Sequence, residues 1–170
     1  MISVDMPSIN TYILPVKEQD LEKTSSDPST HIGMDKFAID FEVPEGSSVM
    51  AAADGEVIFS KVNSNEGGDD TKYEDFKFYN HIVIKHGNGE YTEYGHLRHN
   101  GAKRLIGDRV YRGDVIAVSG NTGYSEKPHL HFSVFRLNKM DPDFNTLPQG
   151  KGYFINDNDF GFETVEPRFV

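Results

Sequence analysis

Short apolar runs, separated by clusters of Gly, Asn, Asp and Ser, dominate this chain of 170 residues. This pattern favours short strands joined by turns over long helices. The 16 glycines and 8 prolines agree with many turns. With 36% hydrophobic residues, the chain has enough apolar side chains for one compact domain. We therefore expect a mostly β fold with few or no long helices.

The clearest strand pattern lies in residues 36–43, where apolar side chains alternate with polar ones or alanine. A period of two is the period of a strand, and it turns Asp40 away from the core. Further strands are expected at 47–53 and 56–62, joined by a tight hairpin at Asp54-Gly55.

A second hairpin is predicted from residues 81–85 and 90–96, closed by Gly87-Asn88-Gly89. The pattern Gly-x-x-Val occurs at 46–49 and again at 107–110. This repetition is a hint of internal duplication.

We expect a single domain in three parts: an N-terminal segment over 1–30, a core over 31–136, and a C-terminal extension over 137–170 packed on that core. Residues 63–78 are polar and rich in Gly and Asp, which predicts a long loop. Loops of this length are often functional. This loop and the one at 124–127 are candidates to border a substrate groove.

The charge and the lack of cysteine exclude several classes of function. The net charge is −10, with no block rich in Lys or Arg, so nucleic acid is not expected as a partner. Without cysteine, any metal has to be held by His, Asp, Glu or water. No signal peptide and no run of membrane-spanning length is visible in the sequence.

The strongest local signal for chemistry is the stretch from Pro128 to Phe135, whose alternation predicts a strand. His129 and His131 share one face of it, so the two imidazoles can flank one reaction centre. A catalytic zinc site needs three protein ligands and an open position for water. His31 and Asp40 are candidates to join one imidazole of the pair, a donor set suited to Zn²⁺. Spacing alone does not say which of the two histidines is the ligand.

Several ordered motifs together resemble the lysostaphin and LytM type of zinc endopeptidase, which cuts peptide links in peptidoglycan. The resemblance runs from about Thr30 to Val134. It is carried by His31 with Ala38-Ile39-Asp40-Phe41, the segment from Pro44 to Val57, Tyr94-Gly95-His96-Leu97, Gly107-Asp108-Arg109-Val110, and Gly120-Asn121-Thr122-Gly123 leading to His129-Leu130-His131-Phe132.

The resemblance implies barrel-like antiparallel β sheets of the duplicated hybrid motif type, with one zinc ion. It implies that the ligands are His31, Asp40 and His131, and that His96 and His129 are the catalytic imidazoles. Many members of the family place the aspartate four residues after the histidine, a spacing that Asp35 satisfies. Asp40 is preferred, because it lies on a strand four residues before Pro44-Glu45-Gly46 as the family's aspartate does.

The resemblance also implies a substrate in the stem peptides or cross-bridges of peptidoglycan, and a periplasmic or extracellular location. Which peptide bond is cut and the oligomeric state stay open. Two alternatives are a non-catalytic relative that binds peptidoglycan or activates a partner hydrolase, and a metal-free phosphocarrier of similar fold. A carboxylate beside the histidines argues against the phosphocarrier, because it repels phosphate. The remaining histidines, His81, His86 and His99, are expected to be structural or exposed.

Overall fold

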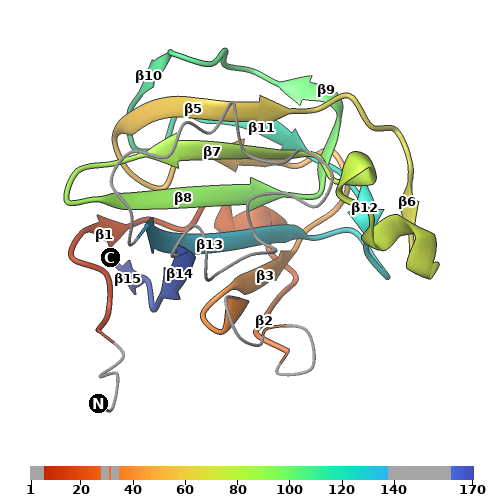
Figure 1. Cartoon of the computed structure of the whole chain (residues 1–170), viewed down its shortest axis with the longest axis horizontal. Helices are drawn as coiled ribbons and strands as arrows, with labels where there is room; N and C mark the ends of the chain where they lie inside the picture. Colours follow the sequence, from red (N-terminus) through yellow and green to blue (C-terminus); the bar gives the residue numbers. More distant parts are fainter. Residues whose placement is uncertain (1–5, 28–30, 32–34, 138–161) are drawn as a thin grey trace.

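A large antiparallel sheet forms the centre of the computed structural model, which describes residues 6–27, 31, 35–137 and 162–170. Its strand order is β10-β5-β7-β8-β13-β3-β2, and a further strand, β14, pairs with β13 (Figure 1). These strands are β2 (Lys23–Ser25), β3 (Ile39–Glu42), β5 (Gly55–Lys61), β7 (His81–Lys85), β8 (Glu90–Gly95), β10 (Arg109–Val110), β13 (Leu130–Leu137) and β14 (Phe162–Val165).

A smaller sheet of three strands packs on one face of the large one. Its order is β4-β11-β9, with β4 at Ser48–Met50, β11 at Val115–Ser119 and β9 at Leu97–Ala102. Buried side chains of both sheets meet in one apolar cluster that includes Val49, Ile116 and Leu97 from the small sheet and Phe41, Ile82, Ile84, Tyr94 and Phe132 from the large one. The core therefore lies between two sheets, as short alternating strands predict.

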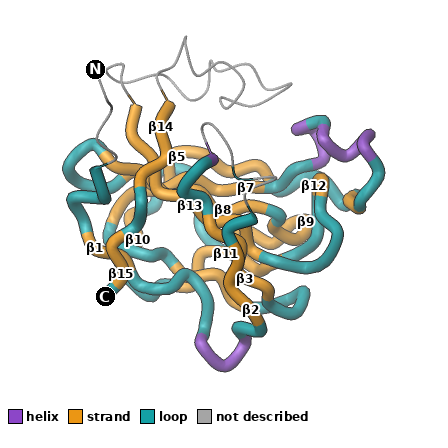
Figure 2. Tube along the Cα trace, turned by 90° about the horizontal axis from the view of Figure 1, so that it is seen from below, coloured by secondary structure: helices purple, strands orange, loops and turns teal. Residues whose placement is uncertain are grey.

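Two short parallel pairs complete the strands. β1 (Thr11–Tyr12) pairs with β15 (Arg168–Phe169), and β6 (Gly67–Gly68) pairs with β12 (Gly123–Tyr124). Figures 1 and 2 both draw β1 and β15 side by side at one edge of the molecule. Through β14 and β15, the last residues of the chain lie on the large sheet and against the N-terminal segment. Residues 138–161 of the predicted extension lie outside the described residues, and the division into three parts stays a prediction.

Within the described residues, the helical segments are single turns of 3-10 helix: η1 (Glu18–Asp20), η3 (Thr71–Glu74) and η4 (Phe76–Phe78). The last two, with β6, lie in the stretch that sequence reasoning treated as a loop. Asp70 and Asp75 begin these turns, and each side chain accepts a hydrogen bond from the backbone N–H two residues on. No helix in this part of the chain is long and apolar enough to cross a membrane.

The two predicted hairpins have different outcomes. β7 and β8 pair as predicted, and Asn88 and Gly89 both have positive φ, of 60° and 67°, as a type I′ turn requires. The hairpin at Asp54-Gly55 is wrong, because β4 pairs with β11 whereas β5 pairs with β7 and β10. Gly55 meets a different need: a Cβ there would lie 2.3 Å from the carbonyl oxygen of Lys85.

The repeated Gly-x-x-Val pattern has a common local geometry. Gly46 and Gly107 both have a φ of 95°. The valines three residues later, Val49 and Val110, are fully buried in the core. The two segments thus make the same kind of turn into β4 and β10, one in each sheet.

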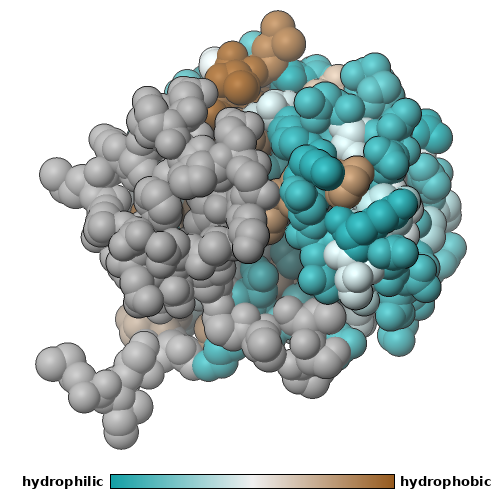
Figure 3. Space-filling model, turned by 45° about the vertical axis from the view of Figure 1, so that its right-hand side comes forward, coloured by the Kyte–Doolittle hydropathy of each residue, from teal (hydrophilic) through white to brown (hydrophobic). Residues whose placement is uncertain are grey.

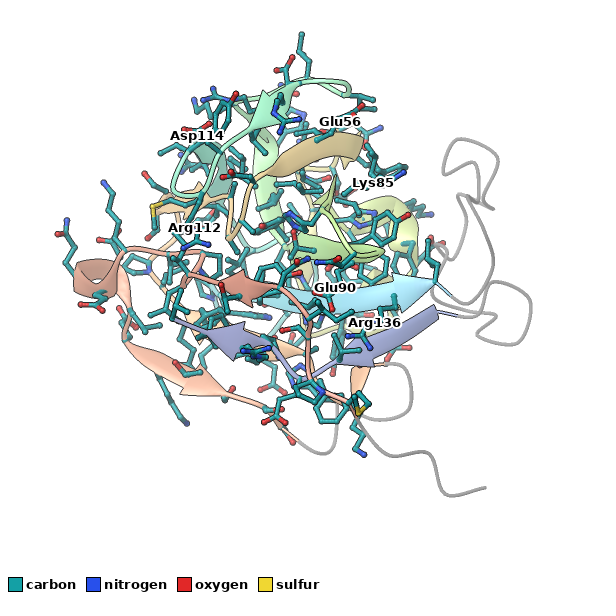
Figure 4. The ribbon with its side chains drawn as sticks, turned by 90° about the vertical axis from the view of Figure 1, so that its left-hand side faces the viewer. Glu56, Lys85, Glu90, Arg112, Asp114 and Arg136 are labelled. Carbon is teal, nitrogen blue, oxygen red and sulfur yellow. The ribbon has the colours of Figure 1, made fainter. Side chains whose placement is uncertain are left out.

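A buried ion pair attaches the N-terminal segment to the large sheet. Glu90 of β8 has no exposed surface, and its Oε2 accepts a hydrogen bond from Nη2 of Arg136 on β13 at 2.8 Å. Figure 4 shows these two side chains pointing toward one another. The backbone N–H groups of Ile9 and Asn10 donate to the same carboxylate at 2.8 and 2.9 Å. Glu90 therefore holds three parts of the chain together.

Candidate metal centre and active site

Asp40 and His131 lie directly opposite each other in the antiparallel pair of β3 and β13. Their neighbours Phe41, Leu130 and Phe132 are buried in the core, so strand alternation turns Asp40 and His131 to the other face. The imidazole Nδ1 of His131 donates to Oδ1 of Asp40 at 3.1 Å. Strand register alone therefore brings together two groups that are 91 residues apart in the sequence.

His31 completes a group of three. Its Nε2 lies 3.4 Å from Oδ2 of Asp40, its ring meets that of His131 edge-on at 5.6 Å, and its side chain is almost fully buried. One donor atom from each of His31, Asp40 and His131 lies within 4.8 Å of the others. Asp35, the alternative to Asp40, does not belong to this group and instead lines a neighbouring pocket.

The donor set of these three residues fits a zinc ion. Two imidazoles and one carboxylate are common zinc ligands, and three protein ligands leave a tetrahedral site one open position. Donor atoms about 2.1 Å from a tetrahedral ion are roughly 3.4 Å apart. Nδ1 of His131 lies 3.1 Å from Oδ1 of Asp40 and Nε2 of His31 lies 3.4 Å from Oδ2, so each imidazole is close to that spacing from one carboxylate oxygen.

The charges in this group reinforce one another. Burial alone would raise the pKa of Asp40, but hydrogen bonds from His131 and His31 and the charges of His131 and His129 outweigh it and hold the pKa well below its usual range. Burial would lower the pKa of His131, but Asp40 outweighs it and raises that pKa to about 9. The carboxylate is therefore ionised at neutral pH, and a metal ion would compete with a proton for His131.

His96 and His129, the predicted catalytic imidazoles, lie beside this group. Their ring centroids are 4.4 Å apart, and Nε2 of His129 is 3.7 Å from Oδ1 of Asp40. Nδ1 of His96 lies 2.6 Å from the carbonyl oxygen of Thr122, and Nδ1 of His129 lies 2.8 Å from that of Lys127. A carbonyl only accepts, so each Nδ1 carries the hydrogen and each Nε2 of the neutral rings is an acceptor.

The surroundings of both rings favour the neutral form. Burial and the nearby imidazoles of His129 and His131 hold the pKa of His96 well below its usual value, and burial lowers the pKa of His129 as well. His96 also has a φ of 59°, a conformation that is uncommon for a residue with a side chain and that often marks functional sites. Both rings are therefore unprotonated at neutral pH, which leaves each Nε2 open to a hydrogen bond or a proton.

A pocket of about 260 Å³ opens beside these imidazoles. It is lined by Asp35, Tyr73, Glu74, Phe76, Tyr79, Glu93, His96, Tyr124 and His131. Four of these residues come from the predicted loops at 63–78 and 124–127, so both loops border this pocket, and their role toward a substrate stays a prediction. Sequence reasoning missed Tyr79 and Glu93, because no local pattern distinguishes them from ordinary strand and turn residues.

Glu93 lies on β8 and is buried, with 2% of its surface exposed. The hydroxyl of Tyr79 donates to its Oε1 at 2.6 Å, and Nδ1 of His81 is 3.8 Å from the same oxygen. Burial raises the pKa of Glu93 to about 7. Burial and the charge of Lys61 lower the pKa of His81 to about 3.

The three remaining histidines separate into two kinds. His81 and His86 are buried, and His86 contacts Asp54 and Thr92 through its two ring nitrogens at 2.7 and 2.8 Å, which is a structural role. His99 is exposed on β9. The expectation that each is structural or exposed agrees with these positions.

Comparison with known proteins shows which family this chain belongs to. Residues 35–142 match Peptidase family M23, and the chain belongs to that family. The chain is 36% identical over 97 residues to the peptidoglycan DD-endopeptidase ShyA of Vibrio cholerae, and 34% identical over 101 residues to the glycyl-glycine endopeptidase ALE-1 of Staphylococcus capitis. These matches cover 56% and 59% of this chain, but only 19% and 24% of the relatives.

Among solved structures, a zinc-containing peptidase from Vibrio cholerae has a similar fold. It aligns with a TM-score of 0.55 at 28% identity, over 74% of this chain and 36% of that one. The family match contains Asp40, His96, His129 and His131 but begins after His31. The inclusion of His31 in the site therefore depends on its distances to Asp40 and His131.

Proposed function

We propose that this chain is a zinc-dependent endopeptidase that hydrolyses peptide bonds in bacterial peptidoglycan. One observation carries the proposal: His31, Asp40 and His131 converge from a loop and two strands, next to the buried imidazole of His96, the partly buried imidazole of His129 and an open pocket. Membership of Peptidase family M23 and the similarity to two peptidoglycan-directed endopeptidases support it. His31, Asp40 and His131 are the proposed ligands of one zinc ion.

When bound, zinc supplies Lewis acidity, which polarises a peptide carbonyl and makes water more acidic. The chain's own residues manage the protons. His129 and His96 are proposed to accept a proton from the attacking water and to deliver one to the leaving amine, since both have an unprotonated Nε2. The imidazole that carries a proton would also stabilise the oxyanion of the tetrahedral intermediate.

The proposed substrate is a stem peptide or a cross-bridge, and the proposed location is therefore periplasmic or extracellular. One relative is named for a DD bond and another for a glycyl-glycine bond, so the bond that this chain cuts is not fixed by similarity. Digestion of defined cross-linked muropeptides, with mass spectrometry of the fragments, would identify it.

Zinc content measured beside turnover tests the assignment of roles. Alanine at His31, Asp40 or His131 should remove zinc and activity together. Alanine at His96 or His129 should abolish most activity while zinc stays bound. His99→Ala is the matched control, because His99 is exposed and lies outside the site. Full activity in the His96 variant would show that its assigned role is wrong.

The same experiment separates the alternatives. A non-catalytic relative would bind zinc but fail to cut any muropeptide, with or without a chelator. A phosphocarrier would contain no zinc and would accept phosphate on a histidine. The Asp40 carboxylate lies 3.1 Å from His131 and 3.7 Å from His129, where it would repel a phosphoryl group on either ring.

A further inference from the structure

The pocket beside the proposed metal site is lined by side chains that the proposed roles of the histidines and Asp40 do not explain. Three carboxylates line it, from Asp35, Glu74 and Glu93, together with the aromatic rings of Tyr73, Phe76, Tyr79 and Tyr124. Apart from the imidazoles of His96 and His131, no basic side chain is among the lining residues. Figure 3 turns this side of the molecule toward the viewer, and its described surface is mostly hydrophilic with scattered apolar patches.

Glu93 is the least expected member of this lining, because a buried carboxylate is costly unless its oxygens are satisfied. Only Oε1 has a hydrogen bond in the described part of the chain, the one donated by Tyr79. No hydrogen-bond donor within that part reaches Oε2. The side chain is more than nine-tenths buried and lines the pocket. It therefore offers a free acceptor to whatever occupies the pocket.

We propose that this pocket binds a primary ammonium group of the peptide substrate, close to the bond that is cut. This inference rests on the proposed peptidase function. The Glu93 carboxylate accepts from the ammonium, and the aromatic side chains surround its alkyl stem and attract its charge through their ring faces. At about 260 Å³ the pocket is smaller than sites for drug-sized ligands, which suits a single side chain or chain end.

The lining favours an organic ammonium over a metal ion. Hard cations such as Ca²⁺ take six to eight oxygen ligands, whereas four aromatic rings offer only their faces and, for tyrosine, a phenol oxygen. His96 and His131 border the same pocket. A substrate that places its ammonium on Glu93 therefore also lies against the imidazoles, which makes the pocket a determinant of substrate choice.

A pair of peptides that differ in one charge tests the proposal. One peptide carries a free primary amine next to the scissile bond, and its partner carries the same amine acetylated. We expect the zinc-loaded protein to cleave the charged peptide with a kcat/KM about tenfold higher or more, the size of effect for a charged hydrogen bond. In Glu93→Gln the ratio between the two peptides should fall to about one. Glu56→Gln, the same change on the exposed start of β5, should keep the ratio (Figure 4).

A binding measurement that needs no turnover keeps the pocket and the enzymatic function separate. n-Butylammonium is titrated into the zinc-loaded protein by NMR, with N-butylacetamide as the neutral probe. Tighter binding of n-butylammonium that is lost in Glu93→Gln supports the pocket even if no peptide is cut, in which case the proposed function fails alone. Cleavage without preference for charge, or equal binding of the two probes, overturns the pocket while the function stands.

Two milder variants cover the case in which Glu93→Gln does not fold. Asp35→Asn and Glu74→Gln change carboxylates on the less buried part of the lining. Each should lower the ratio between the charged and acetylated peptides by a smaller factor than Glu93→Gln. The proposal is contradicted if the wild-type protein shows no preference for the charged peptide and neither variant changes the ratio of kcat/KM between the two peptides.

Discussion

Gly95 shows how a single missing side chain shapes the pocket. A Cβ at this position would lie 1.8 Å from the hydroxyl oxygen of Tyr79 and 2.5 Å from its Cζ. The tyrosine therefore occupies the space in front of β8 and reaches Glu93 only because residue 95 is glycine. Sequence reasoning placed Asp40 and His131 on the outer face from strand alternation. It had no means to find this contact, which depends on a residue in another segment.

Gly95→Ala should therefore destabilise the protein by about 1–3 kcal/mol, the usual cost of forcing an extra carbon into a packed site. The free energy of unfolding from urea titration measures it. Gly87→Ala is the matched control, because a Cβ there meets nothing within 4 Å. In a Tyr79→Leu background the same change should cost much less. An equal cost in both backgrounds would mean that Tyr79 is not the obstacle.

At the scale of elements, β13 connects the site to the rest of the sheet. It pairs with β3, β8 and β14, with His131 near one end and Arg136 near the other. The sequence predicted this strand and its two faces, since eight residues of alternation are a strong local signal. The pairing of β4 was not predictable in the same way. The turn residues Asp54-Gly55 predict that the chain changes direction there, but they do not indicate which sheet each flanking strand joins.

Removal of the buried carboxylate on β8 should be costly. Glu90→Ala leaves Arg136 without its partner and leaves the N–H groups of Ile9 and Asn10 without an acceptor. We expect a loss of about 3 kcal/mol in the free energy of unfolding, the lower end for a broken buried ion pair, because Arg136 keeps some contact with water. Glu56→Ala, at an exposed position, should change the free energy of unfolding little. A loss below about 1 kcal/mol in the Glu90 variant would contradict a structural role for this pair.

At the scale of the whole molecule, the proposed zinc site joins a loop to two strands of the large sheet. A mostly β fold with short strands was predicted from turn residues and alternation, whereas the barrel-like antiparallel sheets were implied by the family resemblance. Residue types made His31 a candidate to join Asp40, but only the resemblance implied that the two meet, because a histidine in a loop has no periodicity that fixes the direction of its side chain. Two loops that line the pocket were candidates from the sequence, but its carboxylates and aromatic rings come from four separate segments, and no local pattern shows that they meet.

Removal of metal should lower the stability of the whole chain. A ligand at a thousand times its Kd stabilises the folded state by about 4 kcal/mol, which for a domain of this size shifts Tm by roughly 8–16 °C. We expect EDTA to lower Tm by an amount in this range in calorimetry, and added zinc to restore it. Asp40→Ala should show no response to EDTA. A wild-type Tm that ignores EDTA would count against a bound metal at this site.

The distance along the chain between the proposed ligands means that the proposed metal site forms only in the folded chain. Asp40 is made long before His131, and the two meet only when β13 has paired with β3. A nascent chain that ends before β13, or one cleaved between these strands and unfolded, has two of the three proposed ligands and no complete metal site. The proposed hydrolytic activity therefore requires the finished tertiary structure.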